Sequence, residues 1–584
     1  MTTILSEIRE RLATAVAALD GTDKFDPQIA AANDTRFGDY QSNAAMVLAK
    51  PLKKNPREVA ALIIEKIDVN GLCETPEIAG PGFINFKVLS GVYAQRLAAM
   101  LDDQRLGTPE VAEKKTILID YSSPNVAKPM HIGHVRSTVI GDCLARVGRF
   151  LGHKVVADNH IGDWGTPIGQ ILYGWKNHLD EAAYSEDPVA ELLRLYQTVK
   201  AEFESDKSVE AECLAETVKL QAKDTENIAL WEKFIDITTN HSAKTYERLD
   251  IRFDIALGES FYDDRLAPLV DELLTEGIAR ESDGAIAVFS NGDLEPKSDP
   301  LLVQRDGEWQ PVPCLVRKKD GGFNYATTDI ATIDYRVEEI KADQVLYVVD
   351  DRQSLHFRQV FDVARQRKIE SNLVHVAFGK ILGKDRKPYK TRSGEVPSLN
   401  SVLDEAVQRA RTTIDEKSTG LTNEEKAEVA EIVGVGAVKY AELSQARASD
   451  YIFDWDKMLA LTGNTAPYLQ YAYVRIRSIF RKLGEDFAAT SEALELTEPA
   501  ERALASKLAQ FGETVPDILN DHRPNILAQY LYELATTFHA FVTECHVLRS
   551  EGIVRKTRLA LCEATARTLR QGLTLLGIAV PEKM

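Results

Sequence analysis

The stretch TILIDYSSPNVAKPMHIGHVRST, residues 116–138, decides the fold of this chain. Residues 116–120 are an apolar run typical of buried strands in parallel sheets, and residues 121–130 are a polar segment with two prolines. Residues 131–151 carry apolar side chains at helical spacing. A second apolar run follows at residues 154–157. This order of strand, loop, helix and strand predicts a Rossmann-type domain with a parallel sheet.

The remaining segments predict a multidomain α/β protein. Residues 1–108 combine an amphipathic helix with two strands around a Gly-Pro-Gly turn, which indicates an N-terminal α+β domain. The Rossmann-type domain is expected over residues 109–399, with a charged helical insertion at about 172–248. A helical connector over residues 400–450 and an all-α helix bundle over residues 451–584 complete the prediction.

Composition places the chain among ordinary globular proteins. It has 584 residues, of which 44% are hydrophobic and 27% charged, so roughly three to five domains are expected. No apolar run approaches the roughly 18–20 residues that a membrane-spanning helix needs, and the N-terminus lacks the apolar core of a signal peptide. Six scattered cysteines without metal-type spacing predict reduced thiols, a cytoplasmic protein and no structural metal.

The charge is acidic overall but unevenly distributed. The net charge of −19, from 70 basic and 89 acidic side chains, argues against indiscriminate binding of polyanions. Residues 434–584 hold 17 basic and 18 acidic side chains, a net of −1, which leaves −18 for the first 433 residues. The C-terminal quarter could therefore meet a polyanion if its basic groups share one face.

The loop-to-helix junction predicts a phosphate site. Ligands of doubly wound folds bind at the carboxyl ends of the strands, and a helix N-terminus favours an anion. His131 and His134 lie three residues apart on one helical face and could donate hydrogen bonds to phosphoryl oxygens, while Lys128 adds a positive charge. Gly133, without a Cβ, would let a nucleotide approach. The alternative is a capped helix with two surface histidines, which His-x-Gly-His alone would favour.

The whole of residues 122–138 resembles the HIGH signature of class I aminoacyl-tRNA synthetases, and Ser-Pro-Asn-Val-Ala-Lys-Pro at 123–129 is the form found in arginyl-tRNA synthetases. Similar stretches recur along nearly the whole chain and are of bacterial type. Segments 37–46 and 80–85 resemble the family's N-terminal domain, 159–166 its active-site floor, 323–330 and 347–356 its amino-acid and ATP pocket, and 450–455 and 464–473 the entry to its anticodon-binding bundle.

A basic loop at residues 379–394 supplies the second catalytic element that the resemblance implies. Between residues 380 and 392 six side chains are basic and one is acidic, so the loop could close over a triphosphate, although a solvated basic loop is the alternative. The Lys-Met-Ser-Lys signature of class I is absent, and residues 384–392 are expected to replace it. The predicted catalytic lysines are Lys128, Lys384, Lys387 and Lys390, and the predicted ATP contacts are Pro129, Gly133, His356, Gly379 and Lys380.

Recognition of arginine can be argued from the shape of its side chain. A guanidinium presents a planar fork of N–H donors that a carboxylate matches. By resemblance, Asp120, Asp329 and the Tyr325 hydroxyl are expected to bind the guanidinium. The alternatives are that Asp120 caps a turn and that Asp329 caps a helix. The remaining substrate contacts implied by the family are Ser123, Asn125 and Gln353, the last two at the α-amino and carboxylate ends.

Contacts with tRNA are expected at two places. Aromatic side chains among basic ones suit stacking on single-stranded bases with phosphate contacts, although part of such a set must be core. This pattern marks the entry to the predicted bundle, and the resemblance adds the N-terminal domain. The predicted tRNA-binding residues are Phe37, Tyr40, Gln41, Asn43, Tyr468, Tyr471 and Arg475.

The resemblance implies a reaction in two steps. The carboxylate of L-arginine attacks the α-phosphorus of ATP, which enters with Mg²⁺, and pyrophosphate leaves. The 2′-hydroxyl of the terminal adenosine of tRNA(Arg) then attacks the acyl-adenylate. The family further implies a monomer without a membrane partner whose adenylate formation requires bound tRNA. The rival hypotheses are a synthetase for another amino acid and a catalytically inactive paralogue that binds RNA.

Overall fold

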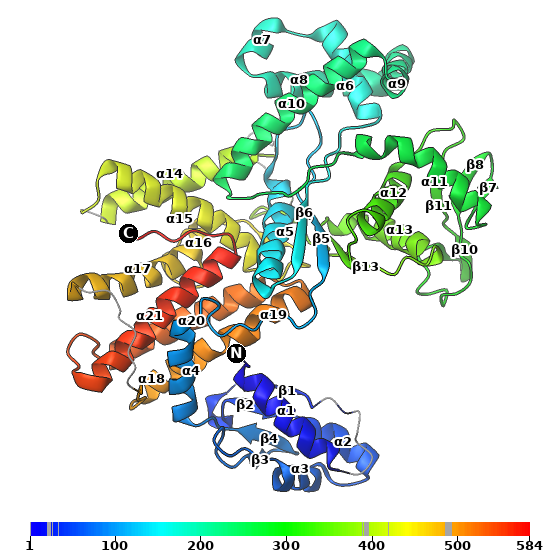
Figure 1. Cartoon of the computed structure of the whole chain (residues 1–584). Coiled ribbons are helices and arrows are strands. Elements are labelled where there is room, and N and C mark those ends of the chain that lie inside the picture. The colour runs from blue at the N-terminus through cyan, green and yellow to red at the C-terminus, as the bar shows by residue number, and fades with distance from the viewer. Residues whose placement is uncertain are drawn as a thin grey trace. The chain divides into compact units, whose positions relative to one another are not determined.

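The structure, a computed structural model, describes residues 2–19, 25, 27–32, 34–387, 389, 396–417, 420–484 and 493–584. The chain divides into two compact units (Figure 1). One unit contains Met1–Val111, Ile414–Val433 and Ala460–Met584, and the other contains Ala112–Thr413 and Gly434–Leu459. Within the described residues, no helix is long and apolar enough to cross a membrane.

A four-stranded parallel sheet forms the centre of the second unit, as the sequence predicts. Its order is β13-β12-β5-β6, and every neighbouring pair is parallel. The register places Asp120 beside Asp158 and Tyr347, so three polar side chains end adjacent strands at the same edge. The strands are β5 (Thr116–Asp120), β6 (Lys154–Asp158), β12 (Gln344–Tyr347) and β13 (Asn372–His375), with the connecting helices α5 (Ile132–Leu151), α12 (Tyr325–Glu338) and α13 (Ser354–Gln366).

A helical insertion follows β6 and packs around its own apolar core. Its helices are α6 (Thr166–His178), α7 (Glu181–Glu186), α8 (Pro188–Ser205), α9 (Lys207–Gln221) and α10 (Thr225–Arg248). The core joins Ile171, Leu192 and Phe234 to Val126 and Ala127, which belong to the loop between β5 and α5. The insertion therefore supports that loop directly.

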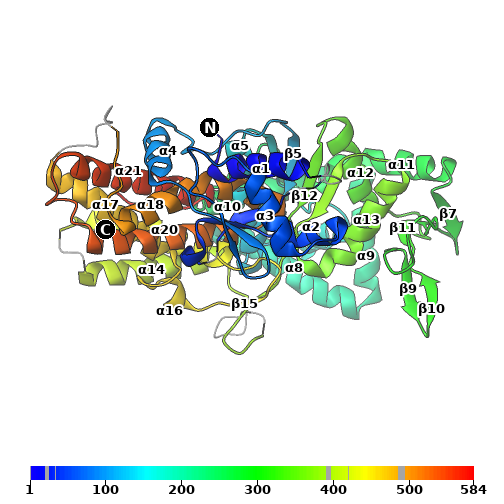
Figure 2. The same cartoon turned by 90° about the horizontal axis from the view of Figure 1, so that it is seen from below.

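Antiparallel strands and short helices complete the second unit. Three strands form a sheet of order β11-β8-β7, whose core is continuous with that of the parallel sheet. A separate hairpin of β9 and β10 extends beyond β11 (Figure 2). The strands are β7 (Ala279–Ser282), β8 (Ala285–Val288), β9 (Leu302–Arg305), β10 (Glu308–Pro311), β11 (Cys314–Arg317), β14 (Ile381–Leu382) and β15 (Tyr451–Ile452). The helices are η2 (Glu259–Tyr262), α11 (Asp263–Thr275), η3 (Asp351–Gln353) and α16 (Trp455–Met458), while α14 (Leu399–Lys417) and α15 (Asn423–Leu443) contribute residues to both units.

The first unit, which contains both ends of the chain, joins an N-terminal α+β segment to a C-terminal helix bundle. Both fold classes agree with the prediction. An antiparallel sheet of order β1-β2-β4-β3 lies in the N-terminal part. Its elements are α1 (Ile4–Ala17), β1 (Ile29–Ala31), η1 (Thr35–Phe37), β2 (Tyr40–Ser42), α2 (Ala44–Leu52), α3 (Pro56–Lys66), β3 (Glu77–Ala79), β4 (Phe83–Phe86) and α4 (Ser90–Asp102). The bundle consists of α17 (Ala466–Leu483), α18 (Pro499–Ala509), α19 (Phe511–Asp521), α20 (Asn525–Glu544) and α21 (Gly552–Leu575).

Buried polar contacts hold these two parts of the first unit together. Helix α4 packs against α18 and α21. The Arg502 guanidinium lies 2.7 Å from the Asp39 carboxylate, and the Tyr40 hydroxyl donates a hydrogen bond to Glu513 at 2.9 Å. These contacts link residues more than 450 positions apart in the chain.

We predict that Gly141→Ala destabilises the second unit. Gly141 of α5 packs on the fully buried Tyr121 ring, and a methyl group there would overlap the ring. Overpacking of this kind costs about 1–3 kcal/mol, so the midpoint of thermal unfolding should fall. Gly91→Ala in α4 is the matched control, because a Cβ there meets nothing within 4 Å. Equal midpoints for the two variants would contradict the packing argument.

Candidate active site

The loop between β5 and α5 adopts a strained conformation. Ser122, Ser123 and Ala127 have φ values of 75°, 49° and 62°. Residues other than glycine rarely adopt this left-handed region, at a cost of order 1–3 kcal/mol each, and they persist only where the surroundings determine the conformation. Strain concentrated in one short loop at the edge of the sheet marks this loop as a functional segment.

Three side chains from three different elements hold the strained backbone. The Ser122 amide donates to Ser137 Oγ of α5 at 2.9 Å, and the Ser123 amide donates to Asn159 Oδ1, after β6, at 3.1 Å. The Ala127 amide donates to Thr238 Oγ1 of α10 at 3.0 Å. Each residue in the left-handed region thus has its N–H fixed by a side-chain oxygen.

The predicted substrate residue Asn125 is fixed on the segment 159–166. The backbone beside it pairs with Gly162, since Val126 N donates to Gly162 O at 3.0 Å and Gly162 N donates to Pro124 O at 3.2 Å. A Cβ on Gly162 would overlap the Asn125 side-chain oxygen. Asn125 itself is exposed. The segment 159–166, which was predicted to form the floor of the active site, therefore supports the loop around Asn125.

The two histidines cap α5 with the same ring nitrogen. His131 Nδ1 accepts from the Gly133 amide at 3.0 Å, and His134 Nδ1 accepts from the His131 amide at 3.1 Å. The ring centroids are 4.0 Å apart. An accepting Nδ1 carries no proton, so each neutral ring carries its proton on Nε2. The pair can therefore donate two hydrogen bonds away from the helix backbone.

Both imidazoles are held in the neutral form. His131 lies at the surface, but partial desolvation of its ring and the neighbouring positive charge of Lys128 lower its pKa. Burial, with a smaller effect of His131, lowers the pKa of His134 to about 4. Gly133 is required here because a Cβ would lie 2.7 Å from His131 Cε1. The lack of a Cβ at Gly133 thus makes room for the His131 ring, whereas the sequence suggested that it makes room for a nucleotide.

Lys128 and Pro129 precede the histidines, and both are half-buried. The Lys128 ammonium lies 4.1 Å from the centroid of the Tyr196 ring of α8, a cation–π contact. The insertion therefore positions the predicted catalytic lysine as well as the loop.

The basic loop is anchored at both ends. At its start, Gly379 N donates to Arg447 O at 2.9 Å and Lys380 N to Asp450 Oδ1 at 2.6 Å. Just after the loop, Ile132 N of α5 donates to Pro397 O at 3.1 Å. Lys380, Lys384 and Lys387 are exposed, and the Lys384 ammonium lies 3.5 Å from Asp454. Lys390 lies outside the described residues.

The predicted amino-acid and ATP residues meet on α12 and α13. His356 Nε2 and Asp329 Oδ2 are 2.5 Å apart, and both side chains are partly exposed. Tyr325, one helical turn before Asp329, is 66% exposed at the start of α12, and Gln353 is exposed at the end of η3. His356, predicted as an ATP contact, and Asp329, predicted as an arginine contact, are thus hydrogen-bonded to each other.

A further carboxylate, Glu259 of η2, was missed by sequence reasoning. Burial and the negative charges of Asp329 and Asp163 raise its pKa to about 8. Tyr325 is exposed as a whole, but partial desolvation of its hydroxyl and the charge of Glu259 raise its pKa. Glu259 therefore lies in the same electrostatic environment as the two predicted guanidinium contacts. Its only sequence signal is an isolated acidic residue between Gly258 and Ser260.

The structure does not support Asp120 as a contact for the substrate guanidinium. Its Oδ2 lies 2.7 Å from Nη2 of Arg336, and its Oδ1 accepts from Ser123 Oγ at 3.0 Å. Arg336 is fully buried and also binds Asp158 at 2.7 Å. An internal guanidinium therefore stands where the sequence analysis expected that of the substrate, and it compensates two buried carboxylates.

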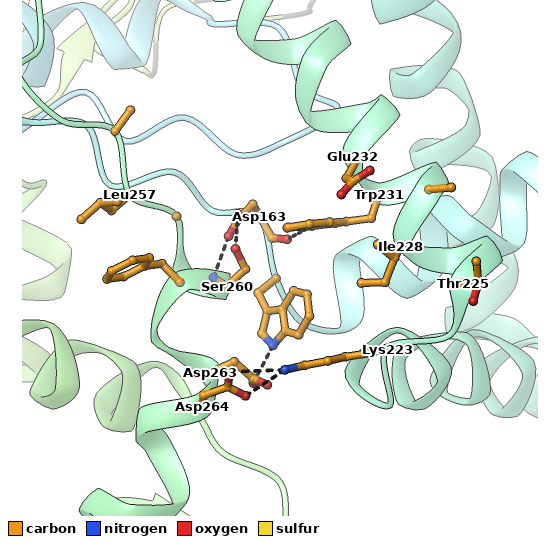
Figure 3. A pocket seen from close by; sticks show the side chains of 15 residues that line it. Asp163, Lys223, Thr225, Ile228, Trp231, Glu232, Leu257, Ser260, Asp263 and Asp264 are labelled. Carbon is orange, nitrogen blue, oxygen red and sulfur yellow. Dashed lines mark hydrogen bonds and ion pairs between the residues drawn. The ribbon is translucent and has the colours of Figure 1, made fainter.

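A cavity of about 830 Å³ adjoins this site between the insertion and η2 (Figure 3). Its polar groups bond to one another: Trp231 Nε1 donates to Asp163 O, Trp164 Nε1 to Asp263, and Lys223 pairs with Asp264. The histidines, Asp329 and Glu259 do not line it. We therefore place the candidate active site at the edge of the sheet, beside this cavity.

The predicted tRNA-binding residues differ in exposure. Phe37 and Tyr471 are 45% and 44% exposed, and Arg475 is exposed. Tyr40 is 1% exposed, so it packs against the bundle and offers no surface to RNA. The three others are half-buried and have partners: Gln41 with Asn85, Asn43 with Gln28, and the Tyr468 ring with the ring of His539.

Comparison with known sequences connects all three parts of the chain to one family. The family model described as tRNA synthetases class I (R), catalytic domain, matches residues 96–455. The model of the DALR anticodon binding domain matches residues 469–584, and that of the arginyl tRNA synthetase N terminal domain matches residues 6–88.

Individual relatives agree over the full length. The chain is 46% identical over 559 residues to an arginine–tRNA ligase of Thermobifida fusca, with 94% of each chain covered. It is 44% identical over 588 residues to that of Laribacter hongkongensis, with 100% of each covered. The solved structure of the arginyl-tRNA synthetase of Plasmodium falciparum matches with a TM-score of 0.85 at 29% identity, with both chains covered completely.

We predict that His134 remains neutral through the physiological range. Its folded-state pKa of about 4 is below the ordinary value of 6.5. The unfolded chain therefore binds more protons at this residue, and the stability contributed by neutral His134 is lost as the pH falls from 6.5 towards 4. An NMR titration of the imidazole resonances, assigned with His134→Asn, measures the midpoint. A midpoint at pH 6 or above would refute the prediction.

Proposed function

The chain belongs to the class I arginyl-tRNA synthetase family, and from this premise we propose that it attaches L-arginine to its tRNA in an ATP-dependent reaction. The observation that carries the proposal is the pair of Nε2 donors at the start of α5, where the same helix also binds the backbone just after the basic loop through Ile132 and Pro397. We do not propose the alternative of an inactive paralogue, because the relatives that match over the full length are arginine–tRNA ligases.

In the first step, ATP would bind with its phosphates at the N-terminus of α5. Nε2–H of His131 and of His134 would donate to phosphoryl oxygens as negative charge develops during attack by the arginine carboxylate. Neutral donors suit this role because their hydrogen bonds are fixed in advance by the capping of the helix. ATP enters as its Mg²⁺ complex, and the chain needs no covalent nucleophile, since positioning and charge stabilisation suffice for phosphoryl transfer.

The lysines would neutralise the leaving pyrophosphate. Lys128 lies beside the histidines, and Lys380, Lys384 and Lys387 extend from the loop whose two ends are anchored near the same helix. We assign Lys390 to the same group by its place in the sequence. Pro129, Gly133, His356 and Gly379 would shape the nucleotide site, with His356 oriented by its hydrogen bond to Asp329.

Arginine would place its guanidinium between Asp329 and Glu259, with the Tyr325 hydroxyl as a further partner. The raised pKa of Glu259 supports this arrangement, because two nearby carboxylates repel until a cation separates them. Asn125, Gln353 and Ser123 would hold the α-amino and carboxylate groups. A pocket that pairs a guanidinium with two carboxylates would reject lysine strongly, because it would leave buried polar groups unpaired.

For the second step we propose that tRNA(Arg) is bound by the N-terminal domain, about residues 1–108, and by the bundle, residues 451–584. Phe37, Tyr471 and Arg475 are the best placed for this, with Gln41, Asn43 and Tyr468 at the same surfaces. The Rossmann-type domain of residues 109–399 would perform the chemistry, and residues 400–450 would connect it to the bundle. We further propose that the enzyme works as a monomer in the cytoplasm.

We expect aminoacylation of tRNA(Arg) with arginine, and arginine-dependent exchange of pyrophosphate into ATP only when that tRNA is present. Purified chain should be assayed with a panel of amino acids, with and without the tRNA. Lysine and citrulline, which lack the guanidinium, should give less than one hundredth of the rate with arginine, an order of magnitude based on unpaired polar groups. Preference for another amino acid would refute the proposed specificity, and equal exchange without tRNA would refute the requirement for tRNA.

We predict that Glu259→Gln removes a pH dependence of arginine binding. In the wild type, Glu259 is largely protonated below its pKa of about 8, so binding of the cation must release a proton. The affinity should therefore rise with pH between about 6.5 and 8, by at most about tenfold per unit. The variant should bind arginine about tenfold more weakly at pH 8 and only slightly more weakly at pH 6.5, measured by calorimetry.

Glu232→Gln is the matched control for this measurement. Glu232 lines the adjoining cavity, which Glu259 does not line. Its loss should leave the pH dependence unchanged. A slope that persists in Glu259→Gln, or that disappears in both variants, would exclude Glu259 as a guanidinium contact.

A further inference from the structure

A buried arginine on α5 contacts the first residue of the basic loop. Arg136, two residues after His134, is 1% exposed. Its Nη1 donates to the carbonyl oxygens of Gly379 at 2.9 Å and of Ser449 at 3.1 Å, and its Nη2 donates to that of Arg447 at 3.3 Å. One guanidinium therefore joins the histidine-bearing helix to the start of the basic loop and to the segment beside it.

The backbone around this guanidinium is closely packed. Gly379 approaches residues 449 and 450 so closely that a Cβ would lie 2.6 Å from the Ser449 carbonyl carbon. Tyr451 N donates to Lys380 O at 3.1 Å, where β14 and β15 pair. Any shift of Arg136 would thus be transmitted to the backbone of Lys380, the first lysine of the loop.

A carboxylate and two rings fix the guanidinium from the other side. Arg136 Nε lies 3.2 Å from Oε2 of Glu442 on α15, and both side chains are 1% exposed. The Tyr451 hydroxyl donates to the same carboxylate, and the guanidinium lies 5.3 Å from the Tyr451 ring and 6.0 Å from the Phe378 ring. A buried ion pair whose positive member also binds three carbonyl groups has a single orientation.

The other end of the loop is attached to the same helix through the backbone. Ile132 N donates to Pro397 O, and Leu399 N donates to Met130 O at 2.9 Å. The N-terminal part of α5 therefore holds both ends of the loop as well as both histidines. The contacts near Pro397 are between peptide groups, whereas the start of the loop is also bound by two side chains, those of Arg136 and Asp450.

We propose that Arg136 is a positioning residue for the nucleotide step: its guanidinium sets the distance between the basic loop and the His131–His134 pair. The proposal rests on the function proposed above, in which loop lysines meet the phosphates that the histidines also contact. Arg136 touches neither substrate. It acts through Gly379 and Lys380, so its loss should alter the use of ATP and leave the binding of arginine intact.

The test compares Arg136→Lys with Arg146→Lys in the full chain. Arg146 lies on the same helix but forms its ion pairs with Asp142 and Asp250, away from the described residues of the loop. Lysine keeps the charge and cannot reach several carbonyl groups and a carboxylate at once. In tRNA-dependent pyrophosphate exchange, Arg136→Lys should lower kcat/KM for ATP at least tenfold and change the Kd of arginine less than twofold. Arg146→Lys should change both less than twofold.

Hydrogen exchange gives a readout independent of catalysis. In Arg136→Lys, peptides that cover residues 377–384 and 447–453 should exchange at least tenfold faster, while a peptide that covers β5 should not change. The positioning role is refuted if these peptides are unaffected, if kcat/KM for ATP stays within twofold of the wild type, or if Arg146→Lys produces the same losses.

A second variant covers the case in which Arg136→Lys does not fold. Glu442→Gln keeps the hydrogen bond from Tyr451 and removes the charge that orients Arg136, and it should lower kcat/KM for ATP at least threefold with arginine binding unchanged. No effect of Glu442→Gln would then refute the proposal. A wild-type chain that is inactive with arginine, ATP and tRNA would instead refute the proposed function, while hydrogen exchange would still decide whether Arg136 holds the loop.

Discussion

The capping of α5 by two imidazole nitrogens is the interaction on which the site depends. A helix N-terminus leaves backbone N–H groups without partners, and here the Nδ1 atoms of His131 and His134 accept from two amides of this end. This use of Nδ1 forces the proton onto Nε2 in both rings, and partial desolvation together with the neighbouring charge of Lys128 lowers the pKa of both rings. The termination of one helix thus sets the tautomer and the orientation of both rings together.

The pairing of buried charges separates carboxylates that are bound to an internal arginine from carboxylates that could bind a ligand. Asp120 and Asp158 end neighbouring strands at one edge, and two buried carboxylates so close need a cation between them. Arg336 supplies it from α12. Asp329, on the same helix, is instead hydrogen-bonded to His356, and burial together with the negative charges of Asp329 and Asp163 raises the pKa of Glu259. An external guanidinium would complete the pattern that Arg336 establishes internally.

The sequence predicts the parts of this site that depend on neighbours in the chain. The strand, the polar loop and the amphipathic helix of residues 116–151 are local patterns, and the structure contains each of them. Contacts between distant residues follow no such pattern. Nothing local distinguishes Asp120, paired with Arg336 from 216 positions away, from a ligand-binding aspartate. Glu259 and Arg136 were overlooked for the same reason, and Tyr40 was misjudged because its partner Glu513 lies in the other terminal segment.

The insertion shows how a segment that interrupts a fold can become necessary to its site. It contributes no predicted catalytic residue, yet its core encloses Val126 and Ala127, and its Thr238 fixes the strained Ala127 amide. Its Tyr196 also supports the Lys128 ammonium. A loop with three residues in the left-handed region would relax to lower-energy conformations if these contacts were absent. The strain that orients the loop is therefore maintained by helices that the parallel sheet itself does not require.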